Sequence, residues 1–373
     1  MPHTFPYAHI VGKDWQSICD KLITTLGDSS HFGDLAFIYM SDQLAGNTDR
    51  ILDYLREKTG ITHWSGSVGL GICSTGKEVY DEASIAVLVT DFADDSFRVL
   101  ETFKGSPTET LAEHKDWRER NMASVALVHS DPASVDLPQH LEEFADGLQG
   151  GFLLGGVTSA NDLQVQIADK ATGGGVSGVL FSASINITSG LSQGCTLIGE
   201  KHRVTESEHN LVSTLDGENA LDVMKNDIGP ELSADLHQLG GIIYVALPVA
   251  SSDTGDYTVR NLLGIDPDHG VLAIGDLVAQ ESQLQFARRD AESAVTDMHQ
   301  MLEGLKKRLP GPVKGALYHT CLGRGRNLFG DDSEELKLIQ EYLGDVPLVG
   351  FYANGEISHR RLYGYTGVLT VFC

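Results

Sequence analysis

The glycine-rich segment CLGRGRNLFG, residues 321–330, holds the residue types best suited to binding chemistry in this chain. Arg324 and Arg326 concentrate positive charge in a sequence that has 27 Lys and Arg against 52 Asp and Glu. An arginine fork can hold a carboxylate in bidentate fashion, and backbone N–H groups around Gly325 can add further donors. The segment therefore predicts a site for a small anion. The alternative is a surface turn whose arginines pair with neighbouring acidic residues.

Cys321 opens this segment, and His319 lies two residues before it. On a strand, side chains two residues apart point to the same side, so His319 could lower the pKa of the thiol. This arrangement keeps open a cysteine-dependent hydrolase that uses Cys321. Because the motif lacks a third group that would orient His319 as a base, we assign no catalytic residue and place both side chains among the ligand-binding candidates.

A second group of candidates lies in the strand GFYANGE, where Tyr352, Asn354 and Glu356 alternate onto one face. If that strand ends beside the arginine loop, Glu356 lies opposite Arg324 and Arg326. A fork for a carboxylate and an acceptor for an ammonium group together match the two charges of an amino acid. The alternative is a hairpin turn with a surface glutamate.

The corresponding segment nearer the N-terminus, GGVTSAND, offers Thr158 and Ser159 as polar groups suited to a small molecule. Other patterns lack the context that their chemistry needs. GICSTGK has phosphate-loop spacing but carries Glu78 where a Ser or Thr would hold magnesium, and GLSQG has no helix pattern after Ser192. The 14 histidines show no metal-ligand spacing, so we expect neither a metal nor a cofactor.

These candidates lie on a unit that the sequence repeats three times, beginning near residues 35, 124 and 315. Each copy has a short apolar strand, a helix, a strand that contains glycine, and a closing apolar strand. Aligning the copies places Met40 with His129 and His319, and it places Asp42 with Asp131 and Cys321.

The helices of the three copies are predicted over 47–60, 136–148 and 332–344, with Asp332 and Glu335 spaced as in a capping box. The segments GIIYVALP and VLAIGD, within 241–276, suggest a degenerate fourth copy. Alternation predicts a hairpin over 202–216, followed by a short helix over 218–226. Apolar residues three and four apart predict a long helix over 290–309.

Glycine inside a strand is costly unless a ligand or another part of the backbone packs closely against it. Together with closing strands that are apolar on both faces, these strands predict a two-layer sheet sandwich with helices outside. We expect an α/β (α+β) fold in which repeated β-α-β-β units form layered mixed sheets, in two pseudo-similar domains. The boundary is predicted near residue 215, which gives domains 1–215 and 216–373.

The 373 residues carry a formal net charge of −25 and are 41% hydrophobic and 21% charged, a balance typical of a folded globular protein. An acidic surface repels phosphate backbones and anionic lipids, so we expect no nucleic-acid partner and no membrane insertion. Five widely spaced cysteines without a CxxC pair indicate a reducing compartment. Because the N-terminus has no signal-peptide pattern, we expect a cytoplasmic protein.

The chain resembles the FIST family, the sensory domains of F-box and intracellular signal transduction proteins. The resemblance rests on ALYHTCLGRGRNLFG followed by VPLVGFYANGEI, on GGFLLGGVTSA, and on the order hairpin, LDGENALDVM, long helix. It implies a FIST N-type and a FIST C-type domain in an intracellular protein that binds small ligands such as amino acids and passes that state to a signalling partner. Since no F-box, kinase, cyclase or receptor segment is recognisable, we expect output through a separate protein.

The sequence thus predicts a small-ligand sensor of signal transduction that binds an amino acid or a related small anion. Two alternatives stay open. One is the hydrolase that uses Cys321, although we favour a binding protein over an enzyme. The other is a protein-interaction module without a small ligand, which an exposed, flat arginine loop would favour.

Overall fold

The structure is a computed structural model that describes residues 4–373 except 29–31, 149–150 and 250–256. It divides into two compact units: the larger unit comprises Met1–Ser192 with His299–Cys373, and the smaller unit comprises Gln193–Met298. The predicted domain boundary, Leu215, is the last residue of a strand inside the smaller unit. In the described part of the chain, no helix is both long and apolar enough to cross a membrane.

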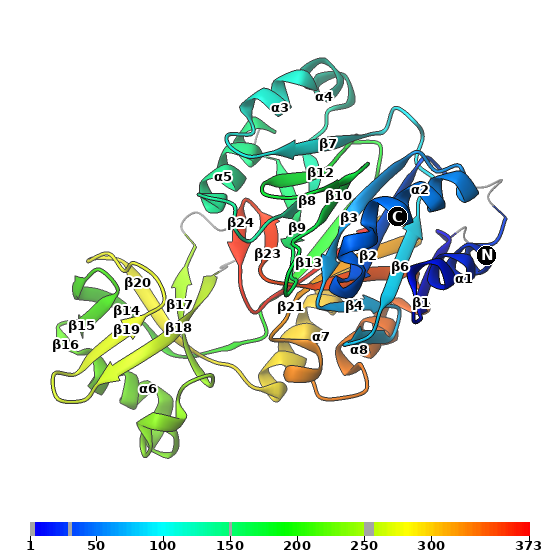
Figure 1. The fold of residues 1–373 in the computed structure, drawn as a ribbon. Coiled ribbons are helices and arrows are strands. Elements are labelled where there is room, and N and C mark those ends of the chain that lie inside the picture. The colour runs from blue at the N-terminus through cyan, green and yellow to red at the C-terminus, as the bar shows by residue number, and fades with distance from the viewer. Residues whose placement is uncertain (1–3, 29–31, 149–150, 250–256) are drawn as a thin grey trace. The chain divides into compact units, whose positions relative to one another are not determined.

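Three six-stranded mixed sheets build the larger unit (Figure 1). In spatial order the first sheet contains β1 (Tyr7–Val11), β6 (Ser84–Val89), β2 (Leu35–Ser41), β3 (His63–Gly69), β10 (Gln166–Ala168) and β11 (Ala171–Thr172). The second contains β24 (Arg361–Tyr363), β23 (Glu356–His359), β9 (Phe152–Val157), β8 (Val125–Ser130), β12 (Val176–Phe181) and β7 (Phe97–Phe103). The third contains β13 (Ile187–Ser192), β25 (Gly367–Phe372), β21 (Gly315–Cys321), β22 (Leu348–Ala353), β4 (Gly71–Ser74) and β5 (Lys77–Tyr80).

The predicted β-α-β-β unit is confirmed and occurs once in each sheet. The three copies are β2-α2-β3-β6, β8-α5-β9-β12 and β21-α8-β22-β25, with helices α2 (Thr48–Thr59), α5 (Leu137–Gly147) and α8 (Glu334–Leu343). In every copy the first two strands are parallel and the closing strand runs antiparallel to the first. The mixed α/β fold class predicted from the sequence is therefore confirmed.

A hairpin leaves each copy and completes another sheet. After β3, the hairpin β4–β5 pairs with β22 in the third sheet. After β22, the hairpin β23–β24 pairs with β9 in the second sheet, and after β9, the hairpin β10–β11 pairs with β3 in the first. This cyclic exchange gives the larger unit a threefold repeat and brings chain segments together that are distant in sequence.

The glycine inside each second strand is explained by the strand beside it. A β-carbon at Gly66 would lie 1.7 Å from a backbone carbonyl oxygen of β2, and one at Gly155 or Gly350 would lie 1.8 Å from a carbonyl of β8 or β21. No side chain fits at such a distance. The close approach that the sequence predicted thus comes from the neighbouring parallel strand.

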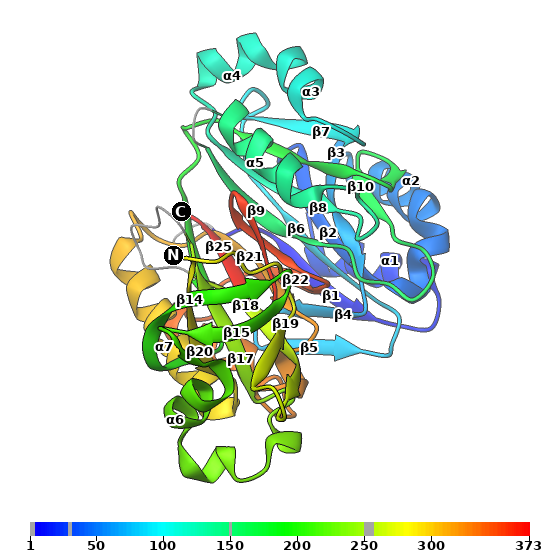
Figure 2. The same ribbon diagram turned by 90° about the vertical axis from the view of Figure 1, so that its left-hand side faces the viewer.

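One apolar core lies between the three sheets, so the predicted two-layer sandwich is wrong. Phe37, Leu127, Phe351 and Phe372 belong to this core, and they come from all three sheets. Helix α1 (Trp15–Leu26) and α2 cover the outer face of the first sheet. Helices α3 (Thr108–Glu113), α4 (Lys115–Asn121) and α5 cover the second sheet, as Figure 2 shows. Each sheet contains a hairpin from a neighbouring copy, so the three copies form three sheets around the core rather than two.

Backbone pairing corrects the alignment of the first copy by one residue. The glycines Gly66, Gly155 and Gly350 pair with Ile38, Val128 and Tyr318. Tyr39, rather than Met40, is therefore equivalent to His129 and His319, and Ser41, rather than Asp42, is equivalent to Asp131 and Cys321. An uninterrupted apolar run does not reveal a one-residue shift, because both faces of these strands are buried.

The equivalent residues Tyr39, His129 and His319 meet in the core. The Tyr39 hydroxyl lies 3.2 Å from Nε2 of His129 and 2.9 Å from Nε2 of His319. Burial lowers the pKa of His129 to about 3 and lowers the pKa of His319 well below its ordinary value. All three side chains are fully buried, so the two imidazoles are neutral core groups at neutral pH.

The smaller unit is an antiparallel barrel. Its strands are β14 (Thr196–Glu208), β20 (Gln283–Arg288), β17 (Ile243–Pro248), β18 (Tyr257–Asp266), β19 (Val271–Ile274), β15 (Leu211–Leu215) and β16 (Glu218–Asn219). Because β15 also pairs with β14, six strands close on themselves. The degenerate fourth copy predicted over 241–276 is wrong, since β17, β18 and β19 form an antiparallel meander there.

Other elements of the C-terminal half agree with the sequence. The predicted hairpin is β14 with β15, and helix α6 (Ala220–Ser233) follows it, kinked at Gly229. The predicted long helix is α7 (Ala291–Arg308). Short 3-10 turns occupy η2 (Asp42–Asn47), η3 (Leu236–Gln238) and η4 (Gly325–Asn327).

Candidate functional site

Arg324, predicted to bind a ligand, lies in a buried ion-pair network of the larger unit. Its Nε donates to Oε1 of Glu335 at 2.7 Å. Its Nη atoms donate to the hydroxyl and the carbonyl oxygen of Ser192 at 3.0 and 3.4 Å. Both charged side chains are fully buried, and the guanidinium lies 5.0 Å from the ring centroid of Phe329. The pair therefore anchors the glycine-rich loop to α8 and to the end of β13.

Glu335 lies at the centre of this network, whereas the sequence predicted that it caps the helix. Its Oε1 also accepts hydrogen bonds from the hydroxyls of Tyr318 and Thr320 at 2.6 and 3.2 Å. Its Oε2 accepts from the backbone N–H of Gly325 at 2.9 Å. The predicted capping box is wrong, because Ser333 holds the N-cap position of α8 and the carboxylate turns inward. A buried guanidinium requires a counter-charge, and that need outweighs a cap on an exposed helix end.

Arg326 points to the surface, away from the buried pair. Its Nη2 lies 3.0 Å from a carboxylate oxygen of Asp81, and its guanidinium stacks 4.3 Å from the ring centroid of Tyr80. Gly325 between the two arginines is buried at φ 51°, and a β-carbon there would meet Tyr80 and Tyr352. The two arginines therefore do not form one carboxylate-binding fork, because the tightly packed turn at Gly325 directs them to opposite environments.

Tyr352, Asn354 and Glu356 do not share a face, so the predicted alternation is wrong. Strand β22 ends at Ala353, and β23 begins at Glu356 in the second sheet. The Tyr352 hydroxyl donates to Glu78, whereas Asn354 is exposed. The two-residue period fails because the chain crosses from one sheet to another between these residues.

Glu356 is the most unusual polar group of the candidate set. It is fully buried, and its Oε2 accepts from the backbone N–H and the hydroxyl of Thr366 at 3.1 and 2.8 Å. Its Oε1 is also buried and has no hydrogen-bond partner among the described residues. Burial raises the pKa of Glu356 to about 8, although the hydrogen bonds from Thr366 and the charge of Arg324 oppose the rise. At neutral pH the side chain is therefore a carboxylic acid.

Cys321 lies next to Glu356 through a shared neighbour, Thr366. The backbone N–H of Cys321 donates to the Thr366 carbonyl oxygen at 3.0 Å, while the other polar groups of Thr366 hold Glu356. The thiol is half-buried and accepts from the N–H of Gly323 at 3.4 Å. His319 instead binds Tyr39 in the core and is neutral, so it lacks the positive charge that would stabilise a thiolate.

Thr158 and Ser159 join strands from all three sheets. The Thr158 hydroxyl lies 2.9 Å from that of Ser67. The Ser159 hydroxyl donates to the Tyr352 carbonyl at 2.5 Å and accepts from the N–H of Leu70 at 3.1 Å. Both side chains are buried, and these bonds give them a positioning role at the crossing of the exchanged hairpins.

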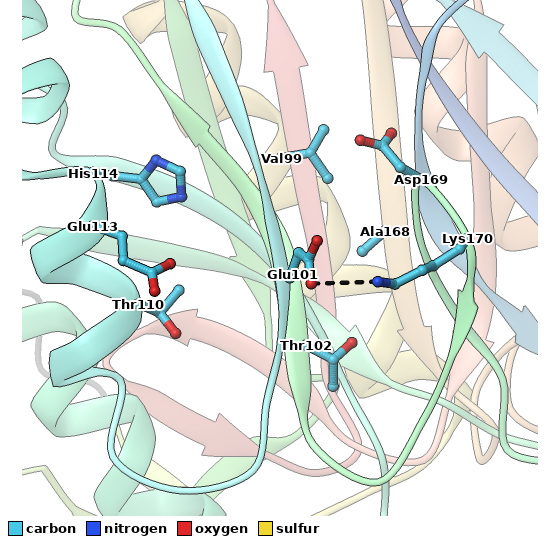
Figure 3. A pocket seen from close by; sticks show the side chains of 9 residues that line it. All are labelled: Val99, Glu101, Thr102, Thr110, Glu113, His114, Ala168, Asp169 and Lys170. Atoms are coloured by element: carbon cyan, nitrogen blue, oxygen red, sulfur yellow. Dashed lines mark hydrogen bonds and ion pairs between the residues drawn. The ribbon is translucent and has the colours of Figure 1, made fainter.

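A separate hollow of about 530 Å³ opens between the edge strand β7, helix α3 and the β10–β11 turn (Figure 3). Its charged lining includes Glu101, Glu113, Asp169 and Lys170, and Lys170 pairs with Glu101 at 3.3 Å. Burial lowers the pKa of the adjacent His114. None of the residues predicted from the sequence to bind ligand lines this hollow. We favour the buried cluster as the site, because among the described residues only Glu356 is a fully buried acid with an oxygen that lacks a hydrogen-bond partner.

The structure brings Cys321, Arg324 and Glu356 into one region and leaves Arg326 and Asn354 on the surface. Sequence reasoning missed Glu335 and Thr366. The signal for Glu335 was available, because a buried arginine needs an acid and the nearest helix supplies one. Within the described ranges, no group of three or more His, Cys, Asp and Glu side chains is placed to hold a metal ion.

Comparison with known proteins places this architecture among related chains. The FIST N domain model matches residues 34–218, and the FIST C domain model matches residues 220–359. Uncharacterized protein Rv0628c of Mycobacterium tuberculosis (strain ATCC 25618 / H37Rv) is 30% identical over 322 residues, which cover 82% of each chain. Uncharacterized protein Mb0898c of Mycobacterium bovis is 31% identical over 321 residues, again 82% of each chain.

Proposed function

Because the chain belongs to the FIST family, we propose that it is a sensory protein that binds a small ligand beside Glu356 and Cys321. FIST domains are regarded as sensory domains of signal transduction. The bound state would pass to a separate signalling protein.

The buried Oε1 of Glu356 supports this proposal most directly. A buried polar atom without a hydrogen-bond partner typically costs about 1–3 kcal/mol. Such a cost is retained where another molecule supplies the missing partner. Perturbed acids close to other charged groups are also typical of functional sites. A ligand that reaches Glu356 would satisfy this atom.

The groups of the cluster match a ligand that has both an ammonium and a carboxylate group, such as an amino acid zwitterion. At neutral pH the Arg324–Glu335 pair is neutral, and the raised pKa keeps Glu356 neutral as well. An ammonium group would bind Glu356 in its ionised form, with the ligand carboxylate in the positive field of Arg324. Since Glu356 is protonated before binding, amino-acid binding below about pH 8 would release a proton.

Thermal unfolding with a panel of amino acids tests the ligand class. We expect amino acids to raise the melting temperature by mass action, and their amides and N-acetyl derivatives to have no such effect. Calorimetry at pH 6.5 in two buffers that differ in ionisation enthalpy should show the release of up to one proton. If no amino acid stabilises the protein, or if the singly charged amides and N-acetyl derivatives stabilise it equally, the amino-acid assignment is wrong.

Glu356→Gln and Arg326→Ala form the matched pair of variants for this test. Glu356→Gln keeps the side-chain shape, and it should weaken binding by about tenfold or more and abolish proton release. Arg326→Ala removes a surface charge from the same loop and should bind as the wild type does. Arg324→Ala is unsuitable, because it leaves Glu335 buried without its counter-charge.

A further inference from the structure

The smaller unit carries an apolar groove that the sensory site does not use. It has a volume of about 320 Å³ and lies between the turn around η3 and strand β18. Its apolar lining consists of Leu236, Leu239, Leu262, Leu263, Ile265 and Pro267. Among the described residues, His237 is the only polar side chain in the lining. A metabolite site usually offers several convergent polar groups, so this groove suits apolar side chains of a protein better than a small molecule.

Exposed leucines extend the groove across neighbouring strands. Leu263 lies at a bulge of β18 and is 61% exposed. Leu211 on β15 is 43% exposed, and it pairs with Ala273 of β19, which also pairs with Gly264 of β18. Strands β18, β19 and β15 lie side by side in the barrel (Figure 1). The leucines therefore belong to one apolar surface, which we call the barrel groove.

Acidic residues flank the barrel groove. Asp235 precedes Leu236, while Asp266 and Asp268 stand on either side of Pro267, and all three carboxyl side chains are exposed. Residues 193–298 contain 6 Lys and Arg and 18 Asp and Glu, a formal net charge of −12. A second copy of this chain or an anionic lipid surface would meet repulsion there. A cationic partner would meet attraction.

From the apolar groove and its acidic rim, we propose that the barrel groove docks a basic amphipathic segment of a partner protein. An amphipathic helix places apolar residues of one face into such a groove while its polar face contacts the rim. The leucines would supply the buried contact, and the aspartates would select Lys and Arg over Glu and Asp. This docking surface does not depend on the ligand proposed for Glu356.

The test uses the full chain and a fluorescein-labelled amphipathic peptide of Leu and Lys, with a matched Leu and Glu peptide as control. We expect the Leu/Lys peptide to bind and the Leu/Glu peptide not to bind. Leu263→Ser should weaken the Leu/Lys complex by about tenfold, the scale of an apolar anchor. Leu163→Ser, at a residue 56% exposed in the larger unit, should change nothing. Asp268→Lys should weaken binding and reduce its salt dependence.

Each remaining outcome overturns the proposal. Equal binding by the wild type and both Leu263→Ser and Asp268→Lys would mean that the peptide binds elsewhere through charge alone. A dimer of the wild-type chain in solution that Leu263→Ser dissociates would assign the barrel groove to a second copy. Binding to anionic vesicles that depends on Leu263 would assign it to a membrane surface.

Discussion

Asp131, which directly follows β8, and Cys321, the last residue of β21, are equivalent in the second and third β-α-β-β units, yet the two units use these positions differently. The Asp131 carboxylate accepts from two backbone N–H groups at 2.8 Å, one of them from Gly174 just before the closing strand. Cys321 reaches the start of its closing strand through a backbone bond to Thr366. In the third unit, the acid at this strand end is Glu356 of the exchanged hairpin β23–β24, which accepts from Thr366.

The two strand ends differ in the polar groups that they bury. The second unit closes the same strand end with an acid whose oxygens both have backbone partners. The third unit adds a buried arginine, a buried glutamate and a carboxylic acid with one oxygen left over. The equivalent backbone of the second unit thus forms without a buried ion pair at this position.

The largest expected effect is on the buried ion pair of the third unit. Glu335→Gln leaves the Arg324 guanidinium buried without its counter-charge, so the free energy of unfolding should fall by about 3–5 kcal/mol in urea unfolding. Asp131→Asn, the counterpart in the second unit, changes a carboxylate that accepts from two backbone N–H groups and should cost about 1–2 kcal/mol. Equal losses in the two variants would contradict the distinction between the two units.

A pH series sharpens the comparison at Glu356. Burial raises its pKa in the folded chain to about 8, above the ordinary value of 4.5. Between these values the folded state keeps a proton that the unfolded state releases, so the group's contribution to stability is present below pH 4.5 and is lost as pH rises through 8. Glu356→Gln has no carboxyl group to titrate, so it does not undergo this loss. The stability of the variant relative to the wild type should therefore rise with pH, by on the order of a few kcal/mol.

The control for this series is Asp131→Asn, since both carboxylate oxygens of Asp131 accept from backbone N–H groups. With rising pH, Glu356→Gln should diverge from the wild type more than this control does. A pH-independent difference for Glu356→Gln would show that Glu356 is ionised in the folded chain, and the proton-release mechanism would then fail.

The smallest expected effect is at Arg326, which shares the loop with Arg324 but lies on the surface. Arg326→Ala loses an exposed ion pair with Asp81 and a contact with Tyr80, so the free energy of unfolding should change by less than about 1 kcal/mol. Thermal and urea unfolding both measure it. A loss as large as that of Glu335→Gln would mean that the two arginines act as one site after all.

The periodic features of the fold were predictable from the sequence. The three repeats, their helices, the barrel hairpin and the long helix follow from apolar spacing and from glycine at fixed places, because these signals arise within one element. The importance of the CLGRGR segment was also evident, since two arginines in so acidic a chain are unusual. The third sheet layer and the barrel were not predicted, because local patterns do not show which distant strands pair.

Tertiary structure alone decided which arginine is buried, which acid pairs with it and which acid stays neutral. Arg324 and Arg326 have almost the same sequence context, and the packing around Gly325 sends one inward and the other outward. The raised pKa of Glu356 depends on its burial. That burial arises because the hairpin β23–β24 leaves the third unit and pairs with β9 of the second sheet. Residue types can thus be read from a sequence, whereas burial and charge pairing arise only when segments distant along the chain meet.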